Sequence, residues 1–388
     1  FTRASSGTYF DSNGVMQLAS ANTPRFDHNP NTKESLGLLI EEQRTNSIRN
    51  NTMQGAVAGT PGTLPTNWTG GSIVNGLARE IVSFGEQSGI AYVDVRYSGT
   101  TTVAGSVVVQ PEGGTSVAAV TGQTWVASSF LAIVGGSLNG ISAVAQQVTG
   151  RSASGGFLEN RDTNTTLTGN IVRYSALRTM TNALTARVTN DIVIIHPNSA
   201  AIDITLRIGM PQLEQGAFAT SVIPTSGAAA TRSADVATMT GTNFSSWYRQ
   251  DEGTVYEEFA RTSYENFGVY GRAFSINDGT AQNCIDYLGF GGTKAMYPVM
   301  NVGYANQINF SATTPSGPLK IAIGIARNNY LLATDGSQAI SDTSCAIPVV
   351  NKIDIGHYAG SDQLNGTIKR LAYYPRRLAN SELQLLTT

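Results

Sequence analysis

Two short polar stretches of the chain carry aromatic side chains of the kind that binds sugars. In NFSSWYRQDEG, two aromatic residues are adjacent, and in RTSYENFG an aromatic residue is followed by an amide two positions later. Aromatic rings stack on the apolar face of a pyranose, and amides hydrogen-bond to its hydroxyl groups. Adjacent aromatic side chains on a loop cannot both face one core, although packing within the fold is the alternative role. The sequence therefore predicts carbohydrate contacts from Trp247, Tyr248, Tyr264 and Asn266.

The acidic residues do not form the pattern that glycoside hydrolysis needs. Most glycosidases place two carboxyl groups on either side of the scissile bond, and a strand can do this with acidic residues two positions apart. The nearest pair, Glu257 and Glu258 in TVYEEFA, is adjacent, so a strand directs the two side chains to opposite faces. We expect these carboxylates to be solvated or to protect a sheet edge. No catalytic residue is assigned, and the chain is predicted not to be an enzyme.

The residues that commonly bind metals are scattered. His28, His196 and His357 lie far apart in the sequence, with no His, Cys or Asp spacing that suits zinc. The two cysteines, Cys284 and Cys345, form either one disulfide or two buried thiols. The thiols are favoured because a chain of this length can build a core without a covalent link. No metal site and no cofactor are predicted from these residues.

Composition indicates a protein of strands and turns with a neutral surface. Charged residues make up 13% of the 388, against roughly 25% in a typical globular protein. The formal net charge of −2 and the absence of a basic stripe argue against nucleic acid as a partner. No apolar run approaches the ~20 residues that cross a bilayer, so no membrane insertion is expected. The first residues, FTRASSGTYF, lack Met and a signal-peptide pattern, as expected for the start of a fragment or of the ordered part of a longer chain.

Residues 1–48 form a short N-terminal arm with two β-hairpin signals. Asn13-Gly14 is a strong turn signal because both residues accept positive φ, and Asn29-Pro30-Asn31 marks a second turn. So short a segment cannot bury a core alone, and it should pack on the next domain or on a neighbouring subunit. The charged groups of Arg25-Phe26-Asp27 and Arg44-Thr45-Asn46 are expected to anchor backbone or subunit contacts.

The rest of the chain is predicted to form two series of short strands. From Trp68 to about Ile223, alternating segments are bounded by Gly, Pro or Asn, and after the connector SGAAATRSAD the strand pattern restarts. This pattern is typical of β-sandwiches and jelly rolls. Trp68 and Trp125 are expected to lie in the core. The predicted fold is all-β, with two tandem jelly-roll β-sandwiches preceded by a short β-hairpin arm. The predicted domains are residues 1–48, 49–230 and 236–388.

Three segments close the chain in the order RNNYLLATDGS, KIDIGHYAG and LNGTIKRLAYYPRRLANSELQLL. This order resembles the end of concanavalin A-like, laminin-G-type jelly rolls, and the resemblance covers roughly residues 236–388. It implies that the final strand is central in one sheet. It also implies that a short helix closes the open end of the sandwich by inserting Leu383 and Leu386, with Ser381 as its N-cap. A structural Ca²⁺ is the one ion that this resemblance would allow.

The segment PQLEQGAFATSVIPTSGAAATRSAD, residues 211–235, resembles the last strand and exit loop of carbohydrate-binding-module-like jelly rolls in bacteriophage virion proteins. The arm, from TYFDSNGVMQL to GLLIEEQRTN, looks like the leader that precedes such modules in phage tail-fibre or head-fibre proteins. Because phage fibres and spikes of this kind are commonly trimers, the resemblance implies a homotrimer.

These features together predict a non-enzymatic phage virion structural protein, namely a fibre, spike or capsid-decoration protein. Its jelly-roll modules would bind host-surface glycans during host recognition. Its partners would be host polysaccharide and other virion proteins, at the surface of the extracellular particle. Two alternatives stay open: a purely structural capsid cement protein without a ligand, and a polysaccharide depolymerase or glycoside hydrolase.

Overall fold

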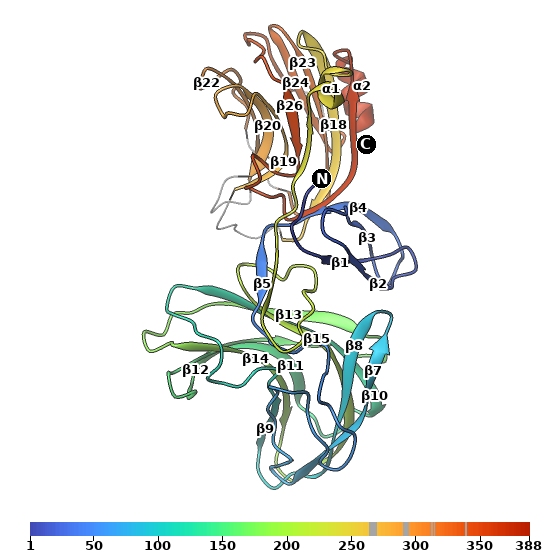
Figure 1. The fold of residues 1–388 in the computed structure, drawn as a ribbon, viewed down its shortest axis with the longest axis vertical. Helices are drawn as coiled ribbons and strands as arrows, with labels where there is room; N and C mark the ends of the chain where they lie inside the picture. Colours follow the sequence, from blue (N-terminus) through green and yellow to red (C-terminus); the bar gives the residue numbers. More distant parts are fainter. Residues whose placement is uncertain (264–269, 290–294, 312, 314, 338–339) are drawn as a thin grey trace. The chain divides into compact units, whose positions relative to one another are not determined.

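The computed structural model describes residues 1–263, 270–289, 295–311, 313, 315–337 and 340–388. These residues form two compact units (Figure 1). The central unit is Arg44–Arg232, and the split unit joins Phe1–Gln43 to Ser233–Thr388. Most of the predicted arm therefore belongs to the same unit as the C-terminal sandwich instead of forming a region of its own.

The central unit, all of whose residues are described, is an antiparallel β-sandwich. Its larger sheet has the strand order β13-β10-β15-β8-β7-β6, and its smaller sheet has the order β12-β11-β14-β9. A short pair, β16-β5, lies at the ends of this segment of the chain. The strands are β5 (Arg44–Asn46), β6 (Ile73–Val74), β7 (Leu77–Gln87), β8 (Ile90–Thr100), β9 (Gly105–Val109), β10 (Thr124–Gly136), β11 (Ala143–Arg151), β12 (Phe157–Asn164), β13 (Val172–Thr179), β14 (Arg187–His196), β15 (Ala201–Gln215) and β16 (Ala230–Arg232).

The core of the central unit fills the space between its two sheets. Val93 and Leu131 of the larger sheet meet Val144 of the smaller one, because alternate residues of each strand point inward. Trp68 and Trp125 are buried at 7% and 5% exposure, so the prediction that both lie in the core is confirmed.

The split unit is a second antiparallel β-sandwich. In its described part, one sheet has the order β17-β26-β19-β20-β21-β22, the other has the order β25-β24-β23-β18-β27-β4-β3, and β1 pairs with β2. The elements are β1 (Gly7–Phe10), β2 (Met16–Ala19), β3 (Phe26–His28), β4 (Ser35–Ile40), β17 (Ala237–Thr240), α1 (Thr242–Ser245), β18 (Glu252–Arg261), β19 (Gly271–Asn277), β20 (Cys284–Gly289), β21 (Met296–Val302), β22 (Ala305–Asn306), β23 (Leu319–Ala326), β24 (Asn329–Thr334), β25 (Ile340–Asp342), β26 (Lys352–Ile355), β27 (Gly366–Tyr374) and α2 (Asn380–Leu386).

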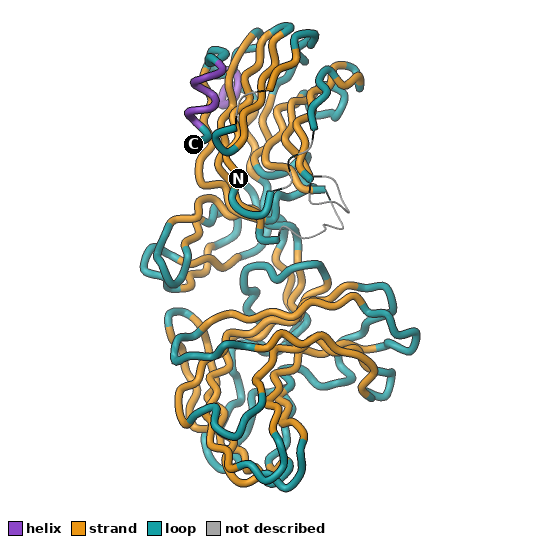
Figure 2. Tube along the Cα trace, turned by 180° about the vertical axis from the view of Figure 1, so that it is seen from behind, coloured by secondary structure: helices purple, strands orange, loops and turns teal. Residues whose placement is uncertain are grey.

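Strands are the main secondary structure of both units, and helix is limited to two short segments of the described chain (Figure 2). The predicted all-β fold with two β-sandwiches is confirmed. Neither helix in the described part of the chain has the length and hydropathy of a membrane span. Cys284 and Cys345 are both buried free thiols.

Both predicted hairpins of the arm are present. The first, β1–β2, turns at Gly14, where φ is +72°. The second, β3–β4, extends the larger sheet of the split unit, because β4 pairs with β27 from Gly366↔Ile40 to Ile368↔Leu38. The arm thus completes the C-terminal sandwich of its own chain.

A buried ionic cluster, formed by Arg3, Arg25, Glu41 and Asp235, anchors the arm within the split unit. Asp235 accepts hydrogen bonds from Arg3 at 3.0 Å and from Arg25 at 2.5 Å, while Arg25 also contacts Glu41 at 2.9 Å. All four residues are at most 2% exposed. Arg25 additionally donates to the Thr8 carbonyl at 2.9 Å. This agrees with the anchoring role predicted for its fork of donors.

The second predicted anchor, Arg44-Thr45-Asn46, makes its contacts inside the central unit. The Arg44 guanidinium lies 5.0 Å from the centre of the Phe218 ring and donates to the Gln215 carbonyl. Asn46 donates to the Ile223 carbonyl at 3.0 Å and accepts from the Leu213 amide at 3.1 Å. These hydrogen bonds join the first residues of the central unit to the backbone of residues 213–223.

The last strand is central, as the laminin-G resemblance implies, since β27 lies between β18 and β4. The helix position differs from the expectation. Leu383 packs with Tyr256 and Ala322, whereas their neighbours Val255 and Ile321 face the core between the sheets. Because adjacent strand residues face opposite ways, α2 covers the outer face of the larger sheet instead of closing the open end.

The start of α2 also differs from the expectation. Its N-cap is Ala379 and not Ser381. The Glu382 side chain accepts a hydrogen bond from the Ala379 amide at 2.7 Å, which satisfies a backbone donor that the helix itself leaves free. Leu386 is partly buried against the same outer-face cluster as Leu383.

Candidate carbohydrate-binding site

The stretch with Trp247 and Tyr248 follows α1, a single helical turn in the split unit. The backbone amides of both residues bond to the Phe244 carbonyl, at 3.3 and 3.2 Å. Phe244 is 1% exposed and points into the core. Successive side chains along a helical turn point about 100° apart. Trp247 and Tyr248 therefore diverge to different sides of the turn.

Four rings form an aromatic cluster here: Phe244, Trp247, Tyr248 and Tyr373. Tyr248 stacks on Phe244 with ring centres 4.6 Å apart, and Trp247 meets Phe244 edge to face at 5.1 Å. Tyr373 of β27 lies 5.0 Å from Trp247 and 5.3 Å from Tyr248. The sequence predictions did not include Tyr373. The alternation of Leu371 and Tyr373 along β27 was the available signal, because it places both on the face toward the smaller sheet.

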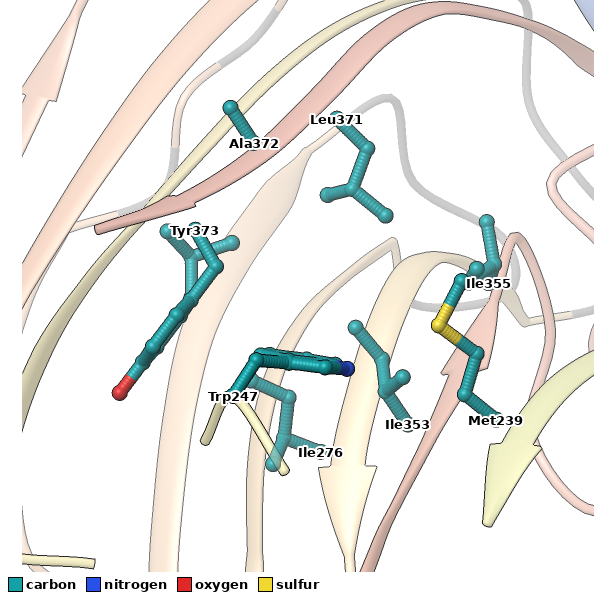
Figure 3. A pocket seen from close by; sticks show the side chains of 9 residues that line it. Met239, Trp247, Ile276, Ile353, Ile355, Leu371, Ala372 and Tyr373 are labelled. Carbon is teal, nitrogen blue, oxygen red and sulfur yellow. The ribbon is translucent and has the colours of Figure 1, made fainter. Parts of the chain in front are cut away.

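Trp247 lines an apolar pocket of about 220 Å³ between the two sheets of the split unit (Figure 3). Its lining comes from β17, β18, β19, β26 and β27, and consists of Met239, Trp247, Val255, Ile276, Ile353, Ile355, Leu371, Ala372 and Tyr373. The polar atoms of the two aromatic residues are bonded to backbone. Trp247 Nε1 donates to the Asn243 carbonyl at 2.6 Å, and the Tyr373 hydroxyl donates to the Glu252 carbonyl at 3.1 Å. The pocket suits an apolar group and not a sugar ring.

Tyr248 lines a second pocket, of about 530 Å³, on the other side of α1. We call it the Tyr248 pocket; its lining is Thr240, Gly241, Phe244, Ser245, Tyr248, Gln250, Val350 and Asn351. No lining residue is charged. The Gln250 amide bonds to both backbone groups of Val350, at 2.6 and 3.2 Å, and so fixes the segment that carries Asn351. The pocket is therefore neutral, with one wall held in place by hydrogen bonds.

The polar groups of the Tyr248 pocket are available to a ligand. The side chains of Thr240, Ser245 and Asn351 are exposed, and none of them bonds to another described residue. The Tyr248 hydroxyl likewise has no hydrogen-bond partner among the described residues. Burial raises the pKa of Tyr248 well above its usual value, so this hydroxyl keeps its proton at neutral pH and can donate. The Tyr248 ring, three hydroxyls and the Asn351 amide, none of these polar groups bonded to another described residue, thus line one hollow.

The four predicted site residues are not all brought together. Trp247 and Tyr248 belong to one aromatic cluster but line different pockets. Tyr264 and Asn266 lie outside the described residues. Asn351 and Ser245, which line the Tyr248 pocket, were not predicted, and no local pattern in the sequence distinguishes them from other exposed polar residues.

The carboxylates singled out in the sequence do not line either pocket. Glu258 is half-buried and 3.7 Å from Lys369. Glu257 is completely buried, so the expectation that it is solvated or protects an edge is wrong. Val255 and Phe259 both face the core between the sheets, so the regular alternation of β18 places Glu257 on that face as well, in register with Ile321 and Leu371. Burial in these apolar surroundings raises the pKa of Glu257 to about 8.

The three histidines occupy separate places. His28 bonds to the Phe10 carbonyl at 3.1 Å, His196 lies 3.3 Å from the Asn75 amide, and His357 accepts from the Ala237 amide at 3.0 Å. Among the described residues, no three His, Cys, Asp or Glu side chains come together in a group that could hold a metal ion.

Comparison with known proteins gives only distant structural similarity. No family model matches the chain, and no curated protein matches it. The similar solved structures include the Ruminococcus gnavus IT-sialidase CBM40, at 16% identity over 38% of this chain and 88% of that one, with a TM-score of 0.30. They also include domains LG4-5 of the mouse laminin alpha1 chain, at 12% identity over 78% and 94% of the two chains, with a TM-score of 0.25. Similarity of this extent does not bear on the function of the site.

Proposed function

We propose that the chain is a non-enzymatic glycan-binding protein and that the Tyr248 pocket holds one neutral sugar unit. The observation that carries the proposal is the combination of the Tyr248 ring with hydroxyl and amide groups that bond to no other described residue. A sugar presents an apolar face and a rim of hydroxyls, and this combination of groups is complementary to both. The neutral lining favours a neutral sugar over a charged one.

Each polar group has a distinct task in this proposal. The Tyr248 hydroxyl and the Asn351 amide nitrogen donate to sugar oxygens, and the Asn351 carbonyl oxygen and the Ser245 hydroxyl accept from sugar hydroxyls. The Tyr248 ring contacts the apolar face of the pyranose. Phe244 and Tyr373 pack against the ring, so little side-chain freedom is lost when the sugar binds. The chain supplies recognition and no bond-breaking step.

The finer part of the proposal rests on sequence resemblance. The arm and the segment 211–235 support a bacteriophage virion component, a fibre, spike or decoration protein at the particle surface. Host polysaccharide and other virion proteins would be its partners, and the oligomer would be a homotrimer. Binding at one pocket would be weak, and several copies on one particle would raise the overall affinity because later contacts become intramolecular.

Replacing Tyr248 by phenylalanine is expected to weaken sugar binding about 2- to 10-fold, the effect of losing one neutral hydrogen bond. The ring and its packing are kept, so the variant should stay folded. Asn351→Ala and Ser245→Ala should each have a similar effect. The measurement is titration of wild type and variants with the neutral oligosaccharides that score highest on a glycan array.

The matched control for this experiment is Ser246→Ala, because Ser246 is exposed next to Ser245 but does not line the pocket. Its affinity should equal that of wild type. Equal loss in Ser245→Ala and Ser246→Ala would show that the Tyr248 pocket is not the binding site, and no array binding at all would argue for the ligand-free cement protein. New reducing ends after incubation with a bound polysaccharide would instead show a hydrolase.

A further inference from the structure

A second hollow lies in the central unit, on the side where the edge strands of its two sheets meet. We call it the Arg161 groove; it encloses about 480 Å³ and is lined by Arg161, Thr163, Ser175, Leu177, Arg178, Thr179 and Thr181. The first two belong to β12, the edge of the smaller sheet, and the next four belong to β13, the edge of the larger sheet. It lies in a different unit from the Tyr248 pocket and is independent of it.

One of the two arginines in the groove is already neutralised. Arg178 donates to Glu159 at 2.5 and 3.0 Å, and Glu159 also accepts from the Thr181 hydroxyl at 2.8 Å and the Asn182 amide at 2.9 Å. Partial burial acts to raise the pKa of Glu159, but these hydrogen bonds outweigh it and lower the pKa to about 2. Glu159 is 8% exposed, so its negative charge is balanced by Arg178 and is not available to a ligand.

The second arginine of the groove, Arg161, is not neutralised in this way. It is exposed, and it has no ion-pair partner among the described residues. Its neighbour Asp162 does not balance it, because alternate residues of β12 face opposite ways and the Asp162 carboxylate accepts from Asn160 at 2.7 Å. The groove therefore carries an excess positive charge, although the whole protein has a net charge of −2.

The rest of the lining matches a sugar. Thr163 and Ser175 carry hydroxyls that bond to no other described residue, and Thr179 shares its hydroxyl with Thr124 at 2.8 Å. Leu177 is 41% exposed and offers an apolar contact. We propose that the Arg161 groove binds a carboxylate-bearing saccharide of the uronic acid type. The Arg161 guanidinium would donate two parallel hydrogen bonds to the carboxylate. The Thr163 and Ser175 hydroxyls would bond to hydroxyl groups of the sugar, and Leu177 would pack on the sugar ring.

This inference is tested by titrating the whole protein with tetragalacturonate and with a hyaluronan tetrasaccharide. Arg161→Gln is expected to weaken binding of an acidic probe about tenfold or more, since a hydrogen bond to a charged group is involved. Arg161→Lys should recover only part of the loss, because an ammonium group lacks the planar fork. The fully methyl-esterified tetragalacturonate should bind at least tenfold more weakly than the acid, and added salt should weaken binding of the acid.

Arg96→Gln is the matched control, because Arg96 is an exposed arginine of the same unit that is paired with Asp203 and Glu80. It should bind the acidic probe as wild type does. Failure of both acidic probes to bind at millimolar concentration overturns the inference, as does equal loss in Arg161→Gln and Arg96→Gln. Tyr248→Phe should leave acidic binding unchanged. Binding that depends on Arg161 would therefore stand even if the Tyr248 pocket proved to bind no neutral sugar.

Discussion

Asp235→Ala is expected to lower the free energy of unfolding of the split unit by about 3 to 5 kcal/mol. In the native protein, two buried arginines, Arg3 and Arg25, are balanced by the carboxylates of Asp235 and Glu41. Removing Asp235 takes away the carboxylate that both buried arginines share, and it also removes the acceptor for the Glu41 amide, bonded at 2.9 Å. The measurement is chemical denaturation, with limited proteolysis to detect release of the arm.

The control for Asp235→Ala is Asp251→Ala in the same unit. Asp251 pairs with Arg249, but its side chain is 67% exposed, so its loss should change the denaturation midpoint little. Asp235→Asn should lie between the two, since it keeps one hydrogen-bond acceptor and loses the charge. If Asp235→Ala unfolds at the same denaturant concentration as Asp251→Ala, the ionic cluster does not hold the arm.

Glu257→Leu is expected to stabilise the split unit by about 3 kcal/mol at pH 7. Both carboxyl oxygens of Glu257 are buried without a hydrogen-bond partner among the described residues. Burial raises the pKa of this carboxyl from 4.5 to about 8, so the folded chain holds a proton that the unfolded chain releases. Leucine has a similar size and requires neither a proton nor a hydrogen bond.

The pH dependence isolates this effect. The ionisation of Glu257 adds no cost below pH 4.5, where both states are protonated, and the added cost grows with pH up to about pH 8. The slope between these values is about 1.4 kcal/mol per pH unit. The difference between wild type and Glu257→Leu should therefore widen from pH 5 to pH 8 in denaturant titrations. Glu257→Gln should remove the same pH dependence, with a smaller gain because its amide stays unpaired.

Glu258→Gln is the matched control, since Glu258 is the adjacent carboxylate and is only half-buried. Glu257 stays in place in this variant, so the loss of stability with rising pH that Glu257 causes should still be seen. A constant difference between wild type and Glu257→Leu across pH 5 to 8 would show that the buried carboxyl does not titrate as proposed.

The Asn13-Gly14 turn and the β3–β4 hairpin could be predicted from sequence because their signals are local, whereas the central place of β27 was implied by the resemblance to laminin-G-type jelly rolls. Turn residues and alternating side chains specify a hairpin within a few positions. The burial of Trp68 and Trp125 was predictable for the same reason. The outer-face position of α2 was not, because its apolar residues fit either the open end or the outer face of a sandwich.

The candidate site was predictable only in part. Adjacent aromatic residues on a polar stretch identified Trp247 and Tyr248, but the chain had to fold before Tyr373 and Asn351 could reach them. Whether an aromatic side chain can bind a sugar depends on the side chains of the pocket that it lines, and these come from distant parts of the chain. That separation of roles, with Trp247 on an apolar pocket and Tyr248 on a polar one, comes from the single turn of α1.

The sequence by itself determined that this protein is built of antiparallel strands with few charges, because alternation and turn chemistry act between neighbours in the chain. Only the tertiary structure decided which charged side chains are buried or paired and which stay exposed to a ligand. Asp235 meets Arg3 and Arg25 across more than 200 residues, Glu257 is enclosed by apolar strands, and Arg161 is left exposed. The energy of a charge depends on its burial and on its partners, and both are set by contacts between distant segments.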